Sequence, residues 1–159
     1  MQRIGFIGAS GLMGHGMAKN LRAKGFPLAL TVHSNRERIA DLLAAGATLA
    51  ATPAELARAS DIVLLCVTGS PQVEAAVAGP EGLLSGAAPG LLIVDTSTAE
   101  PDSTSRLRAQ CEGLGVPTIV GEGVHQSLAL ACSLGFGEKY VASRVEAQEK
   151  LTGAKIIPR

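Results

Sequence analysis

The sequence predicts an α/β protein built on an open, doubly wound parallel sheet. Short apolar runs alternate with helical segments as far as residue 113, and this order favours parallel strands joined by right-handed crossovers. The runs DIVLLCV (61–67) and GLLIVD (90–95) are almost wholly apolar, which is typical of strands buried on both faces. Three glycines also follow the first apolar run, in the strand-to-helix turn GASGLMG (8–14).

The first strand and the first helix are expected at residues 3–7 and 12–24. Gly25 ends the helix, and Pro27 follows where a helix cannot continue. One face of the helix is apolar at a helical spacing, and it carries Met13, Met17 and Leu21. This face is therefore expected to pack on the sheet.

The later elements follow from the same alternation. Thr52 precedes Pro53 and Glu55, which gives a third helix its N-cap, a first-turn proline and a favourable first-turn acid. The remaining strands are expected over residues 28–33, 48–50, 61–67, 90–95 and 116–120. The other helices of this part are expected over residues 36–45, 70–79 and 101–111.

Composition and charge indicate a soluble globular protein. The chain has 159 residues, of which 47% are hydrophobic, and its fourteen acidic and fourteen basic residues balance. A balanced charge does not attract nucleic acid or an anionic membrane, and no apolar stretch approaches the roughly 18 residues of a membrane-spanning helix. The three scattered cysteines are Cys66, Cys111 and Cys132, and Cys66 is expected to be a core residue. They lack metal-ligand spacing, so we expect no metal site. We expect instead reduced thiols and a cytoplasmic location.

The turn GASGLMG is a candidate phosphate-binding loop. It has one residue more than the usual G-x-G-x-x-G, because Ala9 stands where the first glycine would be. Unpaired N–H groups at a helix N-terminus attract a diphosphate, and glycines allow the close approach of backbone and helix. We therefore predict a Rossmann-like dinucleotide-binding domain over residues 1–120, with the diphosphate at Gly8, Ser10, Gly11, Leu12, Met13 and Gly14. Ser10 is either a hydroxyl donor or the helix cap, and the alternative for the glycines is a role in packing alone.

The end of the second strand indicates which dinucleotide is preferred. NAD binders place a carboxylate there, whereas this chain has Ser34, Asn35 and Arg36 and no acid before Glu37. The Arg36 guanidinium suits a 2′-phosphate. NADP(H) is therefore favoured, with NAD(H) as the second choice. The alternative is that Arg36 and Arg38 are solvated residues of a helical first turn.

Several motifs, taken in order, resemble the β-hydroxyacid dehydrogenases: IGFIG, GLMGHGMAKNL, LCVTGSPQVE, GPEGLL and VDTSTAEP. That family includes 3-hydroxyisobutyrate dehydrogenase, tartronate semialdehyde reductase and glyoxylate reductase, with 6-phosphogluconate dehydrogenase and imine reductases as relatives. The resemblance implies hydride transfer between a nicotinamide and a small hydroxy acid or aldehyde. It also implies that Val67 and Thr68 lie along the cofactor, that Ser97 contacts substrate and that Thr98 lies near the nicotinamide ribose. The alternative for DTST (95–98) is a cap for the helix beginning at Pro101.

The C-terminal part departs from the family pattern. IVGEGVHQS (119–127) does not match the family's D-A-P-V-S-G-G segment, and the sequence lacks the G-x-x-x-K-x-x-N-N segment whose lysine is the general acid. Residues 121–159 are instead expected to form a short helical appendage, with helices over 124–134 and 139–152. These helices have little to pack against within one chain, so they are expected to form a homodimer.

Two functions remain open. The first is an NADP(H)-dependent oxidoreductase of the β-hydroxyacid dehydrogenase type. The alternative is an NADP(H)-binding module with little or no catalysis, because the general-acid lysine is not found. His15 and His33 flank the glycine turn, where they are expected to neighbour solvent or phosphate, and His125 is expected to be structural. A short-chain dehydrogenase is disfavoured, because Arg144 occupies the lysine position of Y-x-x-x-K.

Overall fold

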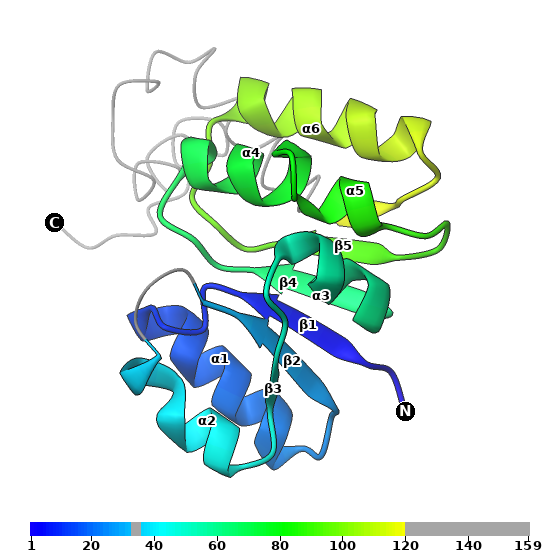
Figure 1. Cartoon of the computed structure of the whole chain (residues 1–159). Coiled ribbons are helices and arrows are strands. Elements are labelled where there is room, and N and C mark those ends of the chain that lie inside the picture. The colour runs from blue at the N-terminus through cyan, green and yellow to red at the C-terminus, as the bar shows by residue number, and fades with distance from the viewer. Residues whose placement is uncertain (33–35, 120–159) are drawn as a thin grey trace, which may run out of the picture. The chain divides into compact units, whose positions relative to one another are not determined.

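In a computed structural model that describes residues 1–32 and 36–119, six parallel strands form one sheet (Figure 1). Their order is β3-β2-β1-β4-β5-β6, and every neighbouring pair is parallel. The strands are β1 (Ile4–Ile7), β2 (Leu28–Thr31), β3 (Thr48–Leu49), β4 (Ile62–Leu65), β5 (Leu92–Asp95) and β6 (Thr118–Ile119). The doubly wound parallel sheet is therefore confirmed.

Helices cover both faces of the sheet (Figure 1). One face carries α1 (Leu12–Ala23) and α2 (Ala40–Ala44). The other carries α3 (Pro53–Ala59), α4 (Ser70–Ala78), α5 (Leu83–Gly86) and α6 (Pro101–Gly113). The chain winds from β1 to β3 in one direction and then from β4 to β6 in the other, so the topological switch point lies between β1 and β4.

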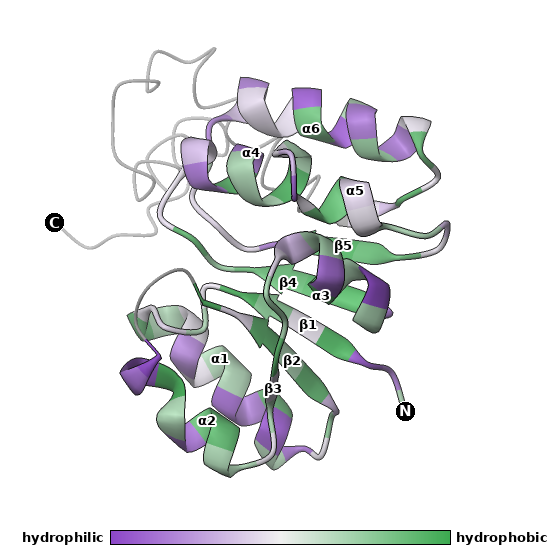
Figure 2. Ribbon diagram, viewed as in Figure 1, coloured by the Kyte–Doolittle hydropathy of each residue, from purple (hydrophilic) through white to green (hydrophobic). Residues whose placement is uncertain are grey.

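Each face of the sheet buries its own apolar cluster. Figure 2 shows hydrophobic strands between helices that are hydrophilic on their outer sides. The cluster beneath α1 and α2 includes Phe6, Leu30, Ile39 and Leu42. The cluster beneath the other helices includes Leu56, Val63, Leu65 and Leu83. These two layers fix the positions of the strand ends, because a close-packed interior leaves little freedom to shift.

The prediction of one continuous helix over residues 36–45 is wrong, because the structure divides this segment into two elements. A single 3-10 turn, η1 (Glu37–Ile39), precedes α2. The break falls at Ile39, whose φ of −120° and ψ of 11° are not helical and whose side chain is fully buried. Tertiary packing of Ile39 thus interrupts a segment that is helical by pattern. The short helix α5 was not predicted, since four residues are too few for a helical period.

Two side chains expected inside are more exposed than predicted. Met13 is 77% exposed, whereas Met17 and Leu21, further along α1, pack against the buried cluster. Only the part of α1 after its first turn therefore presents this face to the sheet. Cys66 follows β4 and is half-buried, so it borders the core instead of filling it.

The predicted start of α3 is confirmed. The Thr52 hydroxyl accepts a hydrogen bond of 3.2 Å from the Glu55 N–H, and Pro53 occupies the first turn. The Glu55 carboxylate in turn accepts a bond of 2.9 Å from the Ala51 N–H. This arrangement resembles a capping box and fixes where the crossover from β3 begins its helix.

Some predictions lie outside the described residues. These are His33, Ser34, Asn35 and the appendage over residues 121–159, which includes Cys132 and His125. Across the two described ranges, no helix combines the length and apolar character needed to cross a membrane. The same ranges contain no cluster of three or more His, Cys, Asp or Glu side chains placed to hold a metal ion.

Candidate functional site

The carboxyl ends of β1, β4 and β5 meet at one edge of the sheet. The Cys66 N–H donates to the Ile7 carbonyl at 3.0 Å, and the Thr96 N–H donates to the Leu65 carbonyl at 2.9 Å. Each bond continues the strand pairing by one residue, so the turns that follow the three strands start side by side. The predicted residues of these turns therefore gather at the switch point, where open α/β sheets bind ligands.

The turn after β1 leaves no room for a side chain at two of its glycines. The Gly11 N–H donates to the Gly8 carbonyl at 3.0 Å and closes the turn. Gly8 has a φ of +97°, and a Cβ there would lie 2.8 Å from the Cys66 carbonyl carbon. A Cβ at Gly14 would lie 2.9 Å from the Gly8 carbonyl carbon. The glycines thus let the turn lie against β4 and let α1 lie against the turn.

The added residue of the turn is accommodated in the core. Ala9 is 1% exposed and belongs to the cluster beneath α1 and α2. The side chain at this point is a buried methyl group. A glycine is consequently not required at Ala9, and the lengthened spacing is compatible with a phosphate-binding turn.

The first turn of α1 presents unpaired N–H groups. Gly11 is the N-cap, and no side chain caps this helix end, so the predicted role of Ser10 as the cap is wrong. The first N–H groups of an α-helix have no acceptor within the helix. Leu12 and Met13 are 94% and 77% exposed, which leaves this turn open to a ligand. An anion of the size of a phosphate group can therefore reach the N–H groups.

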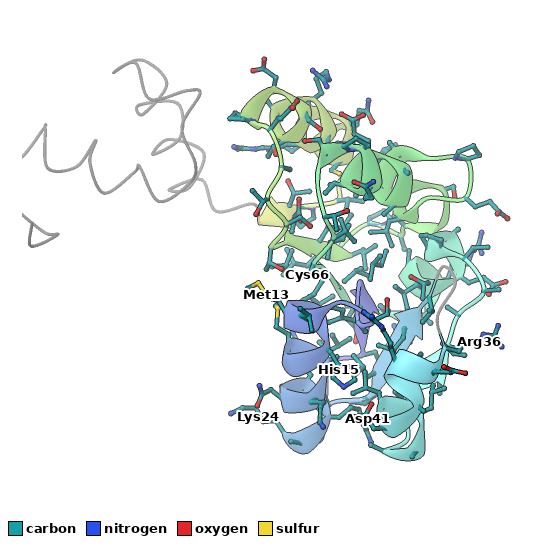
Figure 3. The ribbon with its side chains drawn as sticks, turned by 90° about the vertical axis from the view of Figure 1, so that its left-hand side faces the viewer. Met13, His15, Lys24, Arg36, Asp41 and Cys66 are labelled. Atoms are coloured by element: carbon teal, nitrogen blue, oxygen red, sulfur yellow. The ribbon has the colours of Figure 1, made fainter. Side chains whose placement is uncertain are left out.

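His15 lies in α1, and Arg36 lies at the start of η1. His15 hydrogen-bonds to the Ala9 carbonyl and to Asp41 of α2. Its side chain is 27% exposed, so it borders solvent as expected, and a contact with phosphate stays a prediction. Arg36 is exposed at the start of η1, and Figure 3 shows its side chain directed outward. The sequence carries no local signal for the His15–Asp41 contact, because 26 residues separate the partners.

The loop after β5 is held against the loop after β4. The Val67 N–H donates to the Ser97 Oγ at 3.0 Å, and the Thr96 hydroxyl donates to the Leu65 carbonyl at 2.7 Å. The Asp95 carboxylate accepts a bond of 2.8 Å from the Ser97 N–H. These bonds fix the Ser97 hydroxyl beside Val67, while Thr68 and Thr98 remain exposed.

The segment DTST does not cap α6, so that alternative is wrong. The N-cap of α6 is Glu100, and no side chain caps the helix. The Glu100 N–H instead donates to the hydroxyl of Ser70 at 2.8 Å. Ser70 begins α4 and is buried, so it forms a second link between the two loops. The sequence carries no local signal for this role of Ser70, because its partner is 30 residues away.

The lysines of residues 1–32 and 36–119 are Lys19 and Lys24, and neither lies among these loops. Lys19 pairs with Asp41 at 3.1 Å. Lys24 is the C-cap of α1, at the opposite end of the helix from Met13 (Figure 3). The proton donor expected from the family pattern is therefore not found in this part of the chain.

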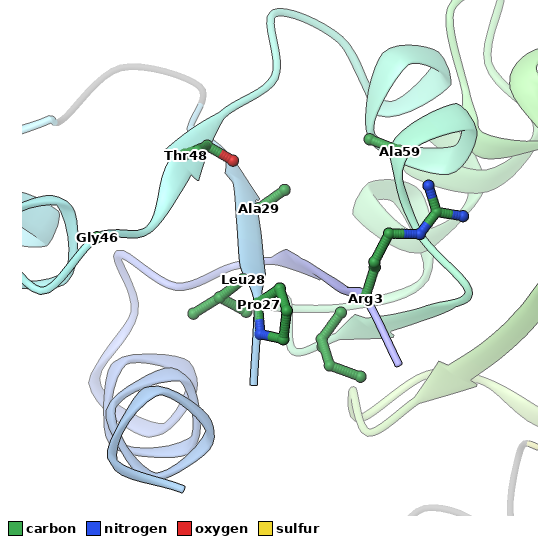
Figure 4. A pocket seen from close by; sticks show the side chains of 8 residues that line it. Arg3, Pro27, Leu28, Ala29, Gly46, Thr48 and Ala59 are labelled. Carbon is green, nitrogen blue, oxygen red and sulfur yellow. The ribbon is translucent and has the colours of Figure 1, made fainter. Parts of the chain in front are cut away.

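A hollow of about 180 Å³ lies at the opposite, amino edge of the sheet (Figure 4). Its lining includes Arg3, Pro27 and Ala59, which precede β1, β2 and β4. The Arg3 guanidinium is paired with Asp61 at 2.7 Å, and this hydrogen bond lowers the pKa of the Asp61 carboxyl and raises that of Arg3. The one cation of the hollow is thus already paired, and we assign the hollow no role in dinucleotide binding.

Comparison with known proteins agrees with this geometry. Residues 3–127 match the family described as the NAD binding domain of 6-phosphogluconate dehydrogenase. The chain belongs to this family. Its resemblance to the β-hydroxyacid dehydrogenases is therefore confirmed.

Relatives of this chain include enzymes and a nuclear factor. The 2-hydroxy-3-oxopropionate reductase of Escherichia coli (strain K12) is 34% identical over 160 residues, which cover 97% of this chain and 53% of that protein. The Homo sapiens protein named cytokine-like nuclear factor N-PAC is 38% identical over 107 residues, which cover 67% of this chain and 19% of that protein. The chain thus spans about half or less of the length of these relatives.

A solved structure shares the same fold. Psf3 in complex with NADP⁺ and 2-OPP is 32% identical, with a TM-score of 0.66 over 72% of this chain and 40% of that chain. The family of this chain is thus a nicotinamide-dinucleotide-binding family, and its homologues include dehydrogenases and reductases of small hydroxy acids.

Proposed function

We propose that this chain binds a nicotinamide dinucleotide, preferentially NADP(H), at the carboxyl edge of its sheet. It would serve an oxidoreductase of the β-hydroxyacid dehydrogenase type, which transfers hydride between the nicotinamide and a small hydroxy acid or semialdehyde. The observation that carries the proposal is the turn at Gly8–Gly14. Its backbone packs too closely for side chains at Gly8 and Gly14, and it directs the open first turn of α1 toward the switch point.

Each part of this edge has a role in the proposal. The N–H groups of Leu12, Met13 and Gly14 bind the diphosphate, helped by the positive end of the α1 dipole. The Ser10 hydroxyl is an additional donor to the diphosphate. Arg36 pairs with the 2′-phosphate, since its guanidinium is exposed and two hydrogen bonds to a phosphate suit its planar shape.

The loops after β4 and β5 hold the reacting end of the cofactor and the substrate. Val67 and Thr68 lie along the cofactor, and Thr98 meets the nicotinamide ribose. The Ser97 Oγ accepts the Val67 N–H, which leaves its own hydrogen free to donate to a substrate oxygen. When bound, the nicotinamide supplies or accepts the hydride. Ser34 and Asn35 belong to the same proposal, at the adenosine ribose.

A second candidate function is a dinucleotide-binding module with little catalysis. Carbonyl reduction requires a proton donor beside the forming alkoxide, and neither Lys19 nor Lys24 lies at this edge. The relationship to N-PAC also supports this candidate, because its name describes a nuclear factor and its match covers 67% of this chain. Both candidates predict cofactor binding, and they differ in turnover.

Fluorescence titrations with NADPH and NADH test the binding proposal, with Arg36→Ala as the variant. A charge-assisted bond contributes about 1.5–3 kcal/mol, so NADPH affinity should fall roughly tenfold or more while NADH affinity stays within about twofold. Arg58→Ala is the matched control, because Arg58 is exposed in the last turn of α3, beside the amino edge of the sheet. Failure of the wild type to bind either dinucleotide would refute the proposal. Equal losses for both dinucleotides would refute the role of Arg36.

Turnover separates the two candidate functions. The wild type and Ser97→Ala are incubated at high concentration with NADPH and a panel of small aldehydes, including glyoxylate, and NADPH absorbance is followed. Turnover by the wild type that falls in the variant supports the oxidoreductase. Intact NADPH binding without turnover supports the module.

Sedimentation velocity tests the proposed homodimer, and a stable monomer at micromolar concentration would contradict it.

A further inference from the structure

His15 is placed between the glycine turn and α2. It is the fourth residue of α1, and its side chain is 27% exposed. Its Nδ1 lies 3.2 Å from the Ala9 carbonyl oxygen, and its Nε2 lies 3.1 Å from Oδ2 of Asp41. Figure 3 shows His15 and Asp41 in the region between α1 and α2. One ring therefore bridges the candidate phosphate-binding turn and a helix of the next βα unit.

Both partners of the ring are hydrogen-bond acceptors. A backbone carbonyl has no hydrogen to donate, and an ionised carboxylate accepts only. Asp41 is ionised at neutral pH, since hydrogen bonds from Lys19 and His15 lower the pKa of its carboxyl despite the opposing effect of desolvation. Asp41 from α2 and Lys19 from α1 are the charged groups in contact here, and the turn contributes backbone alone.

Only the imidazolium form of His15 can satisfy both contacts. A neutral imidazole has one N–H, whereas the imidazolium has two. A neutral ring would give its one N–H to the carboxylate, because charge-assisted hydrogen bonds are stronger. The lone pair on Nδ1 would then face the Ala9 carbonyl oxygen and repel it. Ala9 is 1% exposed, so the repulsion acts on a turn whose buried residue has little room to move.

We propose that His15 is a positioning residue for dinucleotide binding. As the imidazolium it holds the Gly8–Gly14 turn in its anion-binding form, so that binding of the diphosphate is coupled to uptake of a proton. This inference rests on the proposed function, and it adds a pH dependence that the glycine turn alone does not have. The positive charge of the imidazolium also attracts the diphosphate, so this effect favours binding in the same direction as the positioning of the turn.

The direction of the pH dependence follows from these contacts. A rise in pH can remove the second N–H of the ring, whereas an ionised carboxylate and a lysine side chain keep their charges near neutral pH. Dinucleotide affinity should therefore be highest at low pH and should fall as His15 becomes neutral. The fall cannot exceed tenfold per pH unit for one proton.

Isothermal titration calorimetry with NAD⁺ tests the inference between pH 6 and 8.5. NAD⁺ is the probe because NADP⁺ carries a 2′-phosphate monoester, a group whose second ionisation falls near pH 6. The wild type should lose affinity about three- to tenfold over this range. At pH 7 it should take up a fraction of a proton on binding, which is measured in buffers that differ in ionisation enthalpy.

Three variants isolate the ring. In His15→Gln, the pH dependence and the proton uptake should be lost. Lys19→Gln is the matched control, because Lys19 is on the same helix and contacts the same carboxylate but not the turn; it should keep the proton uptake. Asp41→Asn keeps an acceptor but removes the anion, so it should move the affinity change to lower pH. Asp41→Asn also tests the inference if His15→Gln does not fold.

The outcomes separate this inference from the proposed function. If His15→Gln binds NAD⁺ with the wild-type pH profile and proton uptake, the inference is wrong and cofactor binding stands. A pH-independent wild type has the same consequence. If the wild type binds neither NAD⁺ nor NADPH at any pH, both proposals fail. A purely structural role would lower the thermal stability of His15→Gln without changing the proton uptake, so it would be recognised.

Discussion

Replacing Gly14 by alanine tests how closely α1 must approach the turn after β1. The new Cβ would lie 2.9 Å from the Gly8 carbonyl carbon, whereas ordinary contact begins at 3.4 Å. The helix must therefore retreat by at least roughly 0.5 Å, and overpacking of this kind costs about 1–3 kcal/mol. Alanine is also the better helix former by about 1 kcal/mol. The expected net loss of stability is thus roughly 0–2 kcal/mol.

The effect of Gly14→Ala on cofactor affinity should be larger than its effect on stability. The N–H groups proposed to bind the diphosphate move with the helix, so the affinity for NADPH should fall about tenfold or more. Urea unfolding and NADPH fluorescence measure the two effects.

Gly16→Ala is the matched control, because it lies in the same helix and its Cβ would meet nothing within 4 Å. It should gain about 0.5–1 kcal/mol of stability and keep its affinity. If Gly14→Ala behaves like Gly16→Ala in both assays, the close approach has no functional consequence.

Three further predictions concern other parts of the fold. Thr52→Ala removes the cap of α3 and should lower the free energy of unfolding in urea by about 1 kcal/mol; no change would show that Pro53 alone fixes the helix start. Arg3 lowers the pKa of the Asp61 carboxyl, so this pair stabilises the fold above the unfolded-state pKa, and the effect is lost as pH falls through the lowered pKa. The melting temperature of the wild type should therefore fall more steeply below pH 4 than that of Asp61→Asn, and parallel curves would contradict the role of the pair. Burial raises the pKa of the Cys111 thiol, so iodoacetamide at pH 8 should alkylate it only after unfolding, and rapid native labelling, detected by mass spectrometry, would refute its burial.

The loop network around Ser97 shows where prediction from sequence was partial. The motif DTST identified a segment after a central strand, and the structure places it at the carboxyl edge. The bond between Ser97 and Val67 and the bond between Glu100 and Ser70 each join residues 30 apart. No local pattern reports such pairs, because they form only once β4 and β5 lie side by side. The same limit explains why DTST could be mistaken for a helix cap.

The glycine turn was likewise predicted only in part from the sequence. Its glycines, together with the strand before them and the helix after them, predicted a phosphate-binding turn, since the need for small residues between a strand and a helix is a local requirement. The burial of Ala9, which explains the added residue, depends on contacts in the cluster beneath α1 and α2. Likewise, the break at Ile39 reflects its full burial and not the helical pattern of its neighbours.

The alternation of strands and helices, the start of α3 and most of the candidate site residues were predicted from the sequence, whereas α5, the break at Ile39 and the role of Ser70 were not. The elements and the start of α3 depend on side-chain periodicity and on turn chemistry within a few residues, whereas the roles expected of Val67, Ser97 and Thr98 came from the family resemblance. Tertiary structure alone decided the lack of space at Gly8 and Gly14, the bridging position of His15 and the joining of the two loops by Ser70 and Ser97. The physical reason is that distances and hydrogen-bond partners between distant segments are set by close packing of the whole domain.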